Sequence, residues 1–244
     1  MPTVNHIMQP QISEILATLA TLTSARTKKH YVSQGVREPM FGVPVGVLKP
    51  IAKPLIGNQA LAEGLYTTGN YDAMYLAGMI ANTQTMTPDN FRRWMQRADC
   101  YMLSDFVVAV TLAETDFAQT VADEFINDPG EFVQSGGWSC YEWLLGSRKD
   151  HEFDPAHIQQ LLYMVETTIA HKPLVTQHAM IRFVVAVGVS YLPLHLQALH
   201  TATIVNQLLA PTPTKKPTYA DPLVNITQAI NKNRIGFKRR HVRC

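Results

Sequence analysis

The chain has 244 residues, 46% hydrophobic and 16% charged, a composition that excludes disorder over most of its length and can form a sizeable core. No apolar run is long enough to span a membrane, and the first residues lack the basic and apolar regions of a secretion signal. Three widely spaced cysteines, Cys100, Cys140 and Cys244, indicate a reducing compartment and no disulfide framework. We therefore predict a cytoplasmic location without membrane association.

The net charge of +2 conceals an uneven distribution. Residues 211–244 contain eight basic side chains and one acidic one, whereas the rest of the chain contains 13 basic and 18 acidic ones. A basic segment beside an acidic body can bind phosphates, or it can fold back onto that body. The sequence alone leaves both possibilities open.

Apolar residues recur at helical spacing along the whole chain. Residues 12–20 form one predicted helix, and residues 43–56 form another that must be kinked or broken, because Pro50 and Pro54 lack amide donors. Helices capped by asparagines follow: Asn58 precedes 59–67, which ends at Gly69, and Asn70 precedes 71–82.

Three further helices are expected to begin with an oxygen-bearing cap followed by proline, at Thr87-Pro88, Asp154-Pro155 and Asp221-Pro222. Other helical stretches are predicted at 99–113, 117–126, 138–149, 176–191 and 193–209. Residues 183–191 are β-branched enough for a strand, but they lie within a longer helical pattern, so a central buried helix is expected.

These elements predict an all-α fold, an α-solenoid (α-α superhelix) of stacked antiparallel helix pairs. A helical-repeat domain is expected over 1–210, a proline-rich extended linker over 211–221, and a short helix with a basic tail over 222–244. The sequence contains no phosphate-binding loop, serine-hydrolase elbow or histidine cluster of metal-site spacing, so neither a cofactor nor a metal is predicted.

Residues 91–105 are the first candidate site. Three arginines at helical spacing could meet a phosphate backbone: Arg92, Arg93 and Arg97. Tyr101 and Asp105 lie four residues apart on one helical face, where a ring and a carboxylate could hold a cationic ligand. Alternatively, Tyr101 is half-buried and Asp105 pairs with an arginine or caps a helix.

Residues 137–148 are the second candidate, because they concentrate three aromatic side chains and one acid: Trp138, Tyr141, Trp143 and Glu142. Such a density of aromatic rings is found both in binding clefts and in helix–helix cores. Arg182 is isolated in an apolar helix and needs an acidic partner, for which Asp105 or Glu142 would serve.

Several segments resemble the AlkD-like DNA alkylation repair family: residues 41–53, 70–80, 178–190 and 234–244. Tyr101 and Asp105 fall where that family keeps a tryptophan and its catalytic aspartate. The resemblance implies a HEAT-like solenoid whose concave face binds duplex DNA. It also implies the excision of alkylated purines, in which the aspartate stabilises the sugar cation. The chain departs from the family at Tyr101, near Val189, where the second tryptophan would lie, and near Cys140, where a DNA-gripping arginine would lie.

Three hypotheses follow. The first is a DNA alkylation repair-like protein that binds duplex DNA, with Asp105 as its catalytic residue if it is a glycosylase, and with phosphates on Arg92, Arg93, Arg97, Lys238, Arg239, Arg240 and Arg243. The second is a non-catalytic scaffold for a protein or peptide. The third is a small-molecule cleft lined by Tyr101, Trp138, Tyr141 and Trp143, with Asp105, Glu142 and Arg182 as its polar groups.

Overall fold

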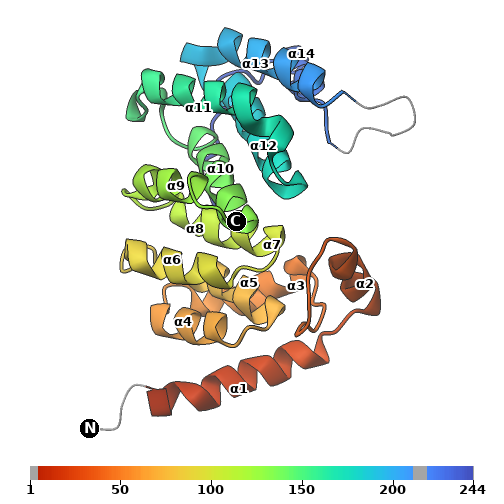
Figure 1. Cartoon of the computed structure of the whole chain (residues 1–244). Coiled ribbons are helices and arrows are strands. Elements are labelled where there is room, and N and C mark those ends of the chain that lie inside the picture. Colours follow the sequence, from red (N-terminus) through yellow and green to blue (C-terminus); the bar gives the residue numbers. More distant parts are fainter. Residues whose placement is uncertain (1–4, 211–218, 244) are drawn as a thin grey trace. The chain divides into compact units, whose positions relative to one another are not determined.

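The computed structural model describes residues 5–210 and 219–243, and within these ranges it contains helices and no strand (Figure 1). The chain divides into two compact units: unit 1 comprises the residues up to Phe117 together with Arg243, and unit 2 comprises Ala118–Val242. The predicted division at residues 210 and 222 stays a prediction, and residues 211–218 of the expected linker lie outside the described ranges.

Unit 1 is arranged as two helical layers. Its elements are α1 (Asn5–Thr21), α2 (Ala25–Ser33), α3 (Val45–Ala52), the 3₁₀ turn η1 (Lys53–Leu55), α4 (Gln59–Thr67), α5 (Tyr71–Ile80), α6 (Pro88–Arg97), α7 (Tyr101–Leu103), the π turn η2 (Ser104–Val108) and α8 (Ala109–Leu112). Helix α5 packs on α4, α3 and η2. Helix α6 joins α4 through Tyr66 and Trp94, whose rings stack at 4.1 Å, and Trp94 donates to Glu63. Thus α4 and α6 form one layer, and α5 forms the other with the continuous helical stretch 101–112.

Unit 2 repeats this layered packing. Its elements are α9 (Ala118–Ile126), α10 (Glu131–Leu145), η3 (Asp150–Glu152), α11 (Pro155–Thr168), η4 (Ile169–His171), α12 (Leu174–Ser190), η5 (Leu192–Leu194), α13 (His195–Leu208) and α14 (Pro222–Asn231). Helices α10, α12 and α14 lie side by side, whereas α11 packs on α13 and α9 packs on α10. The predicted all-α, HEAT-like fold is confirmed.

The helix starts predicted from local capping signals are confirmed. At Thr87-Pro88 the Asn90 side chain accepts the Thr87 backbone N–H at 2.8 Å. The other caps accept backbone N–H groups within the first turn: Asn58 from Leu61 at 3.1 Å, Asn70 from Ala73 at 3.2 Å, Asp154 from Ala156 at 3.0 Å and Asp221 from Leu223 at 2.8 Å. Each of these bonds satisfies an amide that the helix itself leaves unpaired.

Several details differ from the sequence prediction. Helix α10 begins at Glu131, seven residues before the predicted 138, and the Gly136–Gly137 pair that precedes the predicted start lies inside it. Helix α2 was not predicted, although Ser24 caps it by accepting the Thr27 N–H at 3.3 Å. Pro50 lies within α3, and the break comes at Pro54. The predicted helix 99–113 contains a π turn at residues 104–108.

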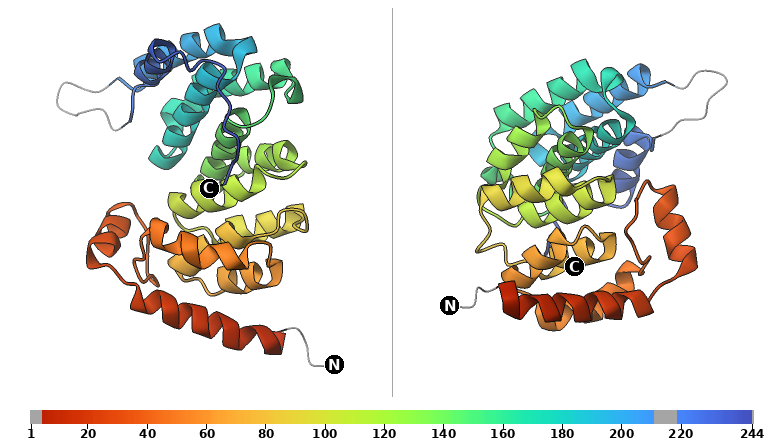
Figure 2. Two further views of the ribbon diagram at one scale, coloured as in Figure 1. Left: turned by 180° about the vertical axis from the view of Figure 1, so that it is seen from behind. Right: turned by 60° about the horizontal axis from the view of Figure 1, so that its bottom comes forward.

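The C-terminal segment runs as an extended chain over unit 2 (Figure 2). Among the contacts that hold it there are Gly236 N–H to Val189 O at 2.7 Å, Arg239 N–H to Gly146 O at 2.7 Å, and Lys238 Nζ to Asp150 at 2.7 Å. Arg243 belongs to unit 1, where it pairs with Glu114 at 2.6 Å and donates to Gly78 O at 2.7 Å. Of the two possibilities for the basic tail, the structure shows the docked one.

Among the described residues, no single helix has the length and hydropathy of a membrane span. The pair 174–190 and 192–208 meets these criteria only together, and it is bent by 106° at its break.

Candidate nucleic-acid interface

A pocket of about 600 Å³ opens on the α10, α12 and α14 layer of unit 2, and we call it the basic pocket. Four cationic side chains line it: Arg182 from α12, Lys232 and Arg234 after α14, and Arg239 from the C-terminal segment. The acidic side chain in its lining is Glu142 of α10. The pocket therefore carries an excess of positive charge, whereas residues 118–210 of the same unit contain four basic and nine acidic side chains.

Arg182 and Glu142 form an ion pair across the pocket wall. Arg182 Nε lies 2.9 Å from Glu142 Oε2, and Arg182 Nη2 donates to Ser139 Oγ at 2.7 Å. Both side chains are largely withdrawn from solvent, 28% and 17% exposed. Glu142, one of the two acids predicted as partners for Arg182, forms this ion pair.

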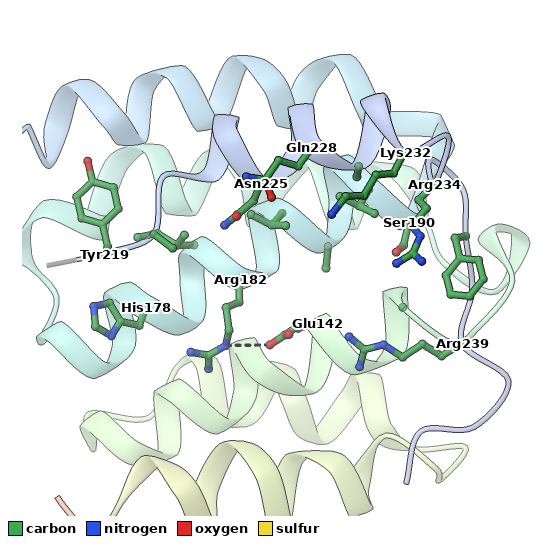
Figure 3. Close-up of a pocket in the computed structure, with 18 residues that line it drawn as sticks. Glu142, His178, Arg182, Ser190, Tyr219, Asn225, Gln228, Lys232, Arg234 and Arg239 are labelled. Atoms are coloured by element: carbon green, nitrogen blue, oxygen red, sulfur yellow. Dashed lines mark hydrogen bonds and ion pairs between the residues drawn. The ribbon is translucent and has the colours of Figure 1, made fainter. Parts of the chain in front are cut away.

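The remaining cations gather at one end of the pocket (Figure 3). The Arg239 guanidinium lies 4.6 Å from the centre of the Trp143 ring, a cation–π contact that orients it. Within the described parts of the chain, Lys232 and Arg234 form no ion pair. Their charges are thus available to an anionic ligand.

The opposite end of the pocket carries His178 and Tyr219 (Figure 3). Burial, and then the nearby carboxylate of Asp221, raise the pKa of the Tyr219 phenol. At neutral pH this hydroxyl is therefore protonated and can donate a hydrogen bond.

Trp138 and Tyr141 lie in the interior of unit 2 and do not line the basic pocket. Each packs against Phe183 of α12, with ring centres 5.2 Å and 6.1 Å apart. Tyr141 donates to Asp123 at 2.8 Å, and burial followed by that carboxylate raises its pKa. Their density reflects helix–helix packing, whereas Trp143 contacts Arg239 of the pocket.

Tyr101 and Asp105 lie in unit 1, at the start of the 101–112 helical stretch. Asp105 is only 1% exposed, lies in the π turn, and accepts the Ser104 hydroxyl at 2.7 Å. Tyr101 is half-buried, as one of the two alternatives predicted, and donates to Gln34 at 2.6 Å. π turns occur often at functional sites, but here the carboxylate is enclosed by protein.

The three arginines of α6 lie in the layer formed with α4. Arg92 pairs with Asp89 at 2.6 Å, and Arg97 donates to the Thr67 carbonyl at 2.9 Å, whereas Arg93 is exposed. Their assignment to phosphates stays a prediction.

The C-terminal cations have separate positions. Lys238 is engaged with Asp150 and the Leu145 carbonyl, and Arg243 with Glu114, so both dock the segment. Arg240 is exposed, and Arg239 faces the pocket. Sequence reasoning counted Lys232 and Arg234 in the basic C-terminal stretch, yet it did not assign them to a site.

In the residues that the structure describes, no group of His, Cys, Asp and Glu side chains is arranged to hold a metal ion.

Paired helices in two layers, with a basic pocket on one of them, define a HEAT-like repeat protein. A solved structure described as "A new family of proteins related to the HEAT-like repeat DNA glycosylases with affinity for branched DNA structures" is 47% identical, with a TM-score of 0.89, and the match covers 96% of this chain and 99% of that one. The model of the family described as "DNA alkylation repair enzyme" matches residues 12–212. The chain belongs to this DNA alkylation repair family, as its resemblances predicted.

More distant relatives include the uncharacterized proteins Lin0241 of Listeria innocua and Lmo0209 of Listeria monocytogenes. Each is 24% identical over 195 residues, which is 78% of this chain and 84% of the relative.

Proposed function

We propose that this protein binds DNA through the basic pocket of unit 2. The observation that carries the proposal is the pair Lys232 and Arg234, which line the pocket without an acidic partner in the described residues. Unpaired cations of this kind attract phosphates and release counterions when they bind them. The solved relative, 47% identical, is described as having affinity for branched DNA structures, and we extend that affinity to this chain.

The proposed DNA contacts are few, since much of the positive charge is neutralised inside the protein. Arg182 is paired with Glu142, and Lys238 with Asp150. We therefore propose that Lys232 and Arg234, with Arg239 beside them, supply the main phosphate contacts.

Two buried free thiols, Cys100 and Cys140, support the proposal of a reducing, cytoplasmic location.

Fluorescence anisotropy with labelled duplex and four-way-junction DNA, over a salt series, tests this proposal. Replacing both Lys232 and Arg234 by alanine should weaken binding about tenfold and should lower the salt slope by about 1.8, because each lost duplex phosphate contact removes about 0.9. The matched control is Arg26→Ala with Lys29→Ala, which removes the same charge from exposed residues of α2. Arg93→Ala with Arg97→Ala tests the surface of α6 in the same assay.

Equal weakening by the α2 control would mean that net charge, and not the pocket, governs binding. Absence of binding at low salt would refute DNA binding and favour the scaffold for a protein partner.

We further propose that DNA binding proceeds without base excision. The support is the burial of Asp105, a residue that is 1% exposed and whose carboxylate accepts a hydrogen bond from the Ser104 hydroxyl. An aspartate that stabilises a sugar cation must contact the sugar. The wild-type chain should therefore release no more 7-methylguanine from methylated DNA than a no-enzyme control, measured by chromatography beside an active alkylpurine glycosylase. Release that Asp105→Asn abolishes would restore Asp105 as the catalytic residue.

A further inference from the structure

The basic pocket has an apolar floor, which phosphate contacts alone do not require. The floor is formed by Ile181, Val185, Ala186 and Val189, which follow one face of α12, and by Ala229 of α14. A volume of about 600 Å³ lies within the range of small-molecule sites. An apolar floor of this size suits a flat heterocycle attached to a charged group.

The pocket also offers polar groups that can read such a heterocycle. Asn225 and Gln228 of α14 face Arg182 and Glu142 across it (Figure 3). In the described parts of the chain, neither side-chain amide makes a hydrogen bond. Each therefore keeps a donor and an acceptor for the edge of a base.

Phe237 supplies an aromatic surface at the same site. It is 61% exposed although it is large and apolar, and it lines the pocket with Arg234 and Arg239. Its segment is held rigidly, because the backbone bonds of Gly236 and Arg239 flank it. An exposed ring beside cations is the combination by which proteins bind unpaired nucleotides, with the base stacked and its phosphate neutralised.

We infer that the basic pocket binds one unpaired nucleotide of a DNA molecule. In this arrangement the base lies on the α12 floor against Phe237, and its phosphates contact Lys232, Arg234 and Arg239. A base within a paired duplex cannot enter such a pocket, since it is stacked on both faces and its edge is already paired. The inference rests on the proposed DNA binding and specifies which structural feature of DNA the protein selects.

The test compares a fully paired duplex with the same duplex carrying a single bulged 2-aminopurine, by anisotropy and by 2-aminopurine fluorescence. The wild-type chain should bind the bulged duplex about tenfold more tightly and should quench the bulged base, because stacking on an aromatic side chain contributes at this scale. Phe237→Ala should abolish the preference for the bulged duplex and the quenching. Since Phe237 is exposed, this variant is expected to fold.

The control variant is Tyr163→Ala, which removes an aromatic ring of similar exposure (66%) from α11, outside the pocket. It should leave the preference unchanged. Equal affinity of the wild type for both duplexes, without quenching, would overturn the inference and leave DNA binding intact, whereas no binding to either would overturn both. If dAMP alone binds, as seen in shifts of backbone amide signals of α14, and DNA does not, the pocket serves a free nucleotide and the inference is wrong.

Discussion

Replacing Asp72 by asparagine is expected to lower the free energy of unfolding by about 3–5 kcal/mol. The Asp72 carboxylate is fully buried and accepts three backbone N–H groups, from Phe41 at 2.6 Å, Gly42 at 3.0 Å and Val43 at 2.8 Å. These bonds hold the connection between α2 and α3 against the start of α5. Asparagine keeps one acceptor oxygen but turns an NH₂ group toward amides that also donate.

The measurement is urea denaturation followed by circular dichroism, with hydrogen exchange of the amides of residues 41–43. Those three amides should exchange faster in the variant, because each has lost its acceptor or shares a weaker one. Asp99→Asn is the control, since it makes the same charge change at an exposed residue, and it should alter stability by no more than about 0.5 kcal/mol. A loss below about 1 kcal/mol for Asp72→Asn would contradict the importance of these bonds.

Replacing Gly137 by alanine is expected to lower the free energy of unfolding by about 3 kcal/mol. A β-carbon at this position of α10 would lie 2.8 Å from Ala122 O and 2.7 Å from Ile126 N, which are backbone atoms of α9 and its last turn. Backbone atoms cannot rotate away, so the two helices must separate. The gain in helix propensity of about 1 kcal/mol offsets only part of this cost.

Gly46→Ala provides the matched comparison, because it makes the same change in helix α3. A β-carbon added at Gly46 would meet no atom of another element within 4 Å. That variant should be neutral or more stable by up to about 1 kcal/mol. Urea midpoints of both variants, followed by circular dichroism, test the contrast. If the two substitutions change the urea midpoint alike, close packing of α10 on α9 is not the reason that position 137 requires glycine.

The sequence by itself determined the helices that begin with a local signal. Asn58, Asn70 and the Asp154-Pro155 step each bind amides within the same first turn. Such bonds depend on residues two or three positions apart, so their pattern can be read without the fold. The family resemblance rested on comparably local segments, and it predicted the layered helical architecture.

The start of α10 shows where local reasoning fails. In isolation, Gly136 and Gly137 favour a helix end, because glycine loses more conformational entropy than other residues when it becomes helical. Contact with α9 reverses this preference, since only glycine admits the close approach of the two backbones. That neighbour can be identified only in the tertiary structure.

The candidate site depended on tertiary structure even more strongly. Arg182 required an acid, which could be deduced from charge and burial, but its pairing with Glu142 required the packing of α10 on α12. Lys232 and Arg234 share a pocket with that pair only because α14 packs against α12, although Lys232 follows Arg182 by 50 residues in the chain. A sequence specifies charges and local hydrogen bonds, whereas the pocket arises from side chains that are distant in the chain and share one surface only after the helices have packed.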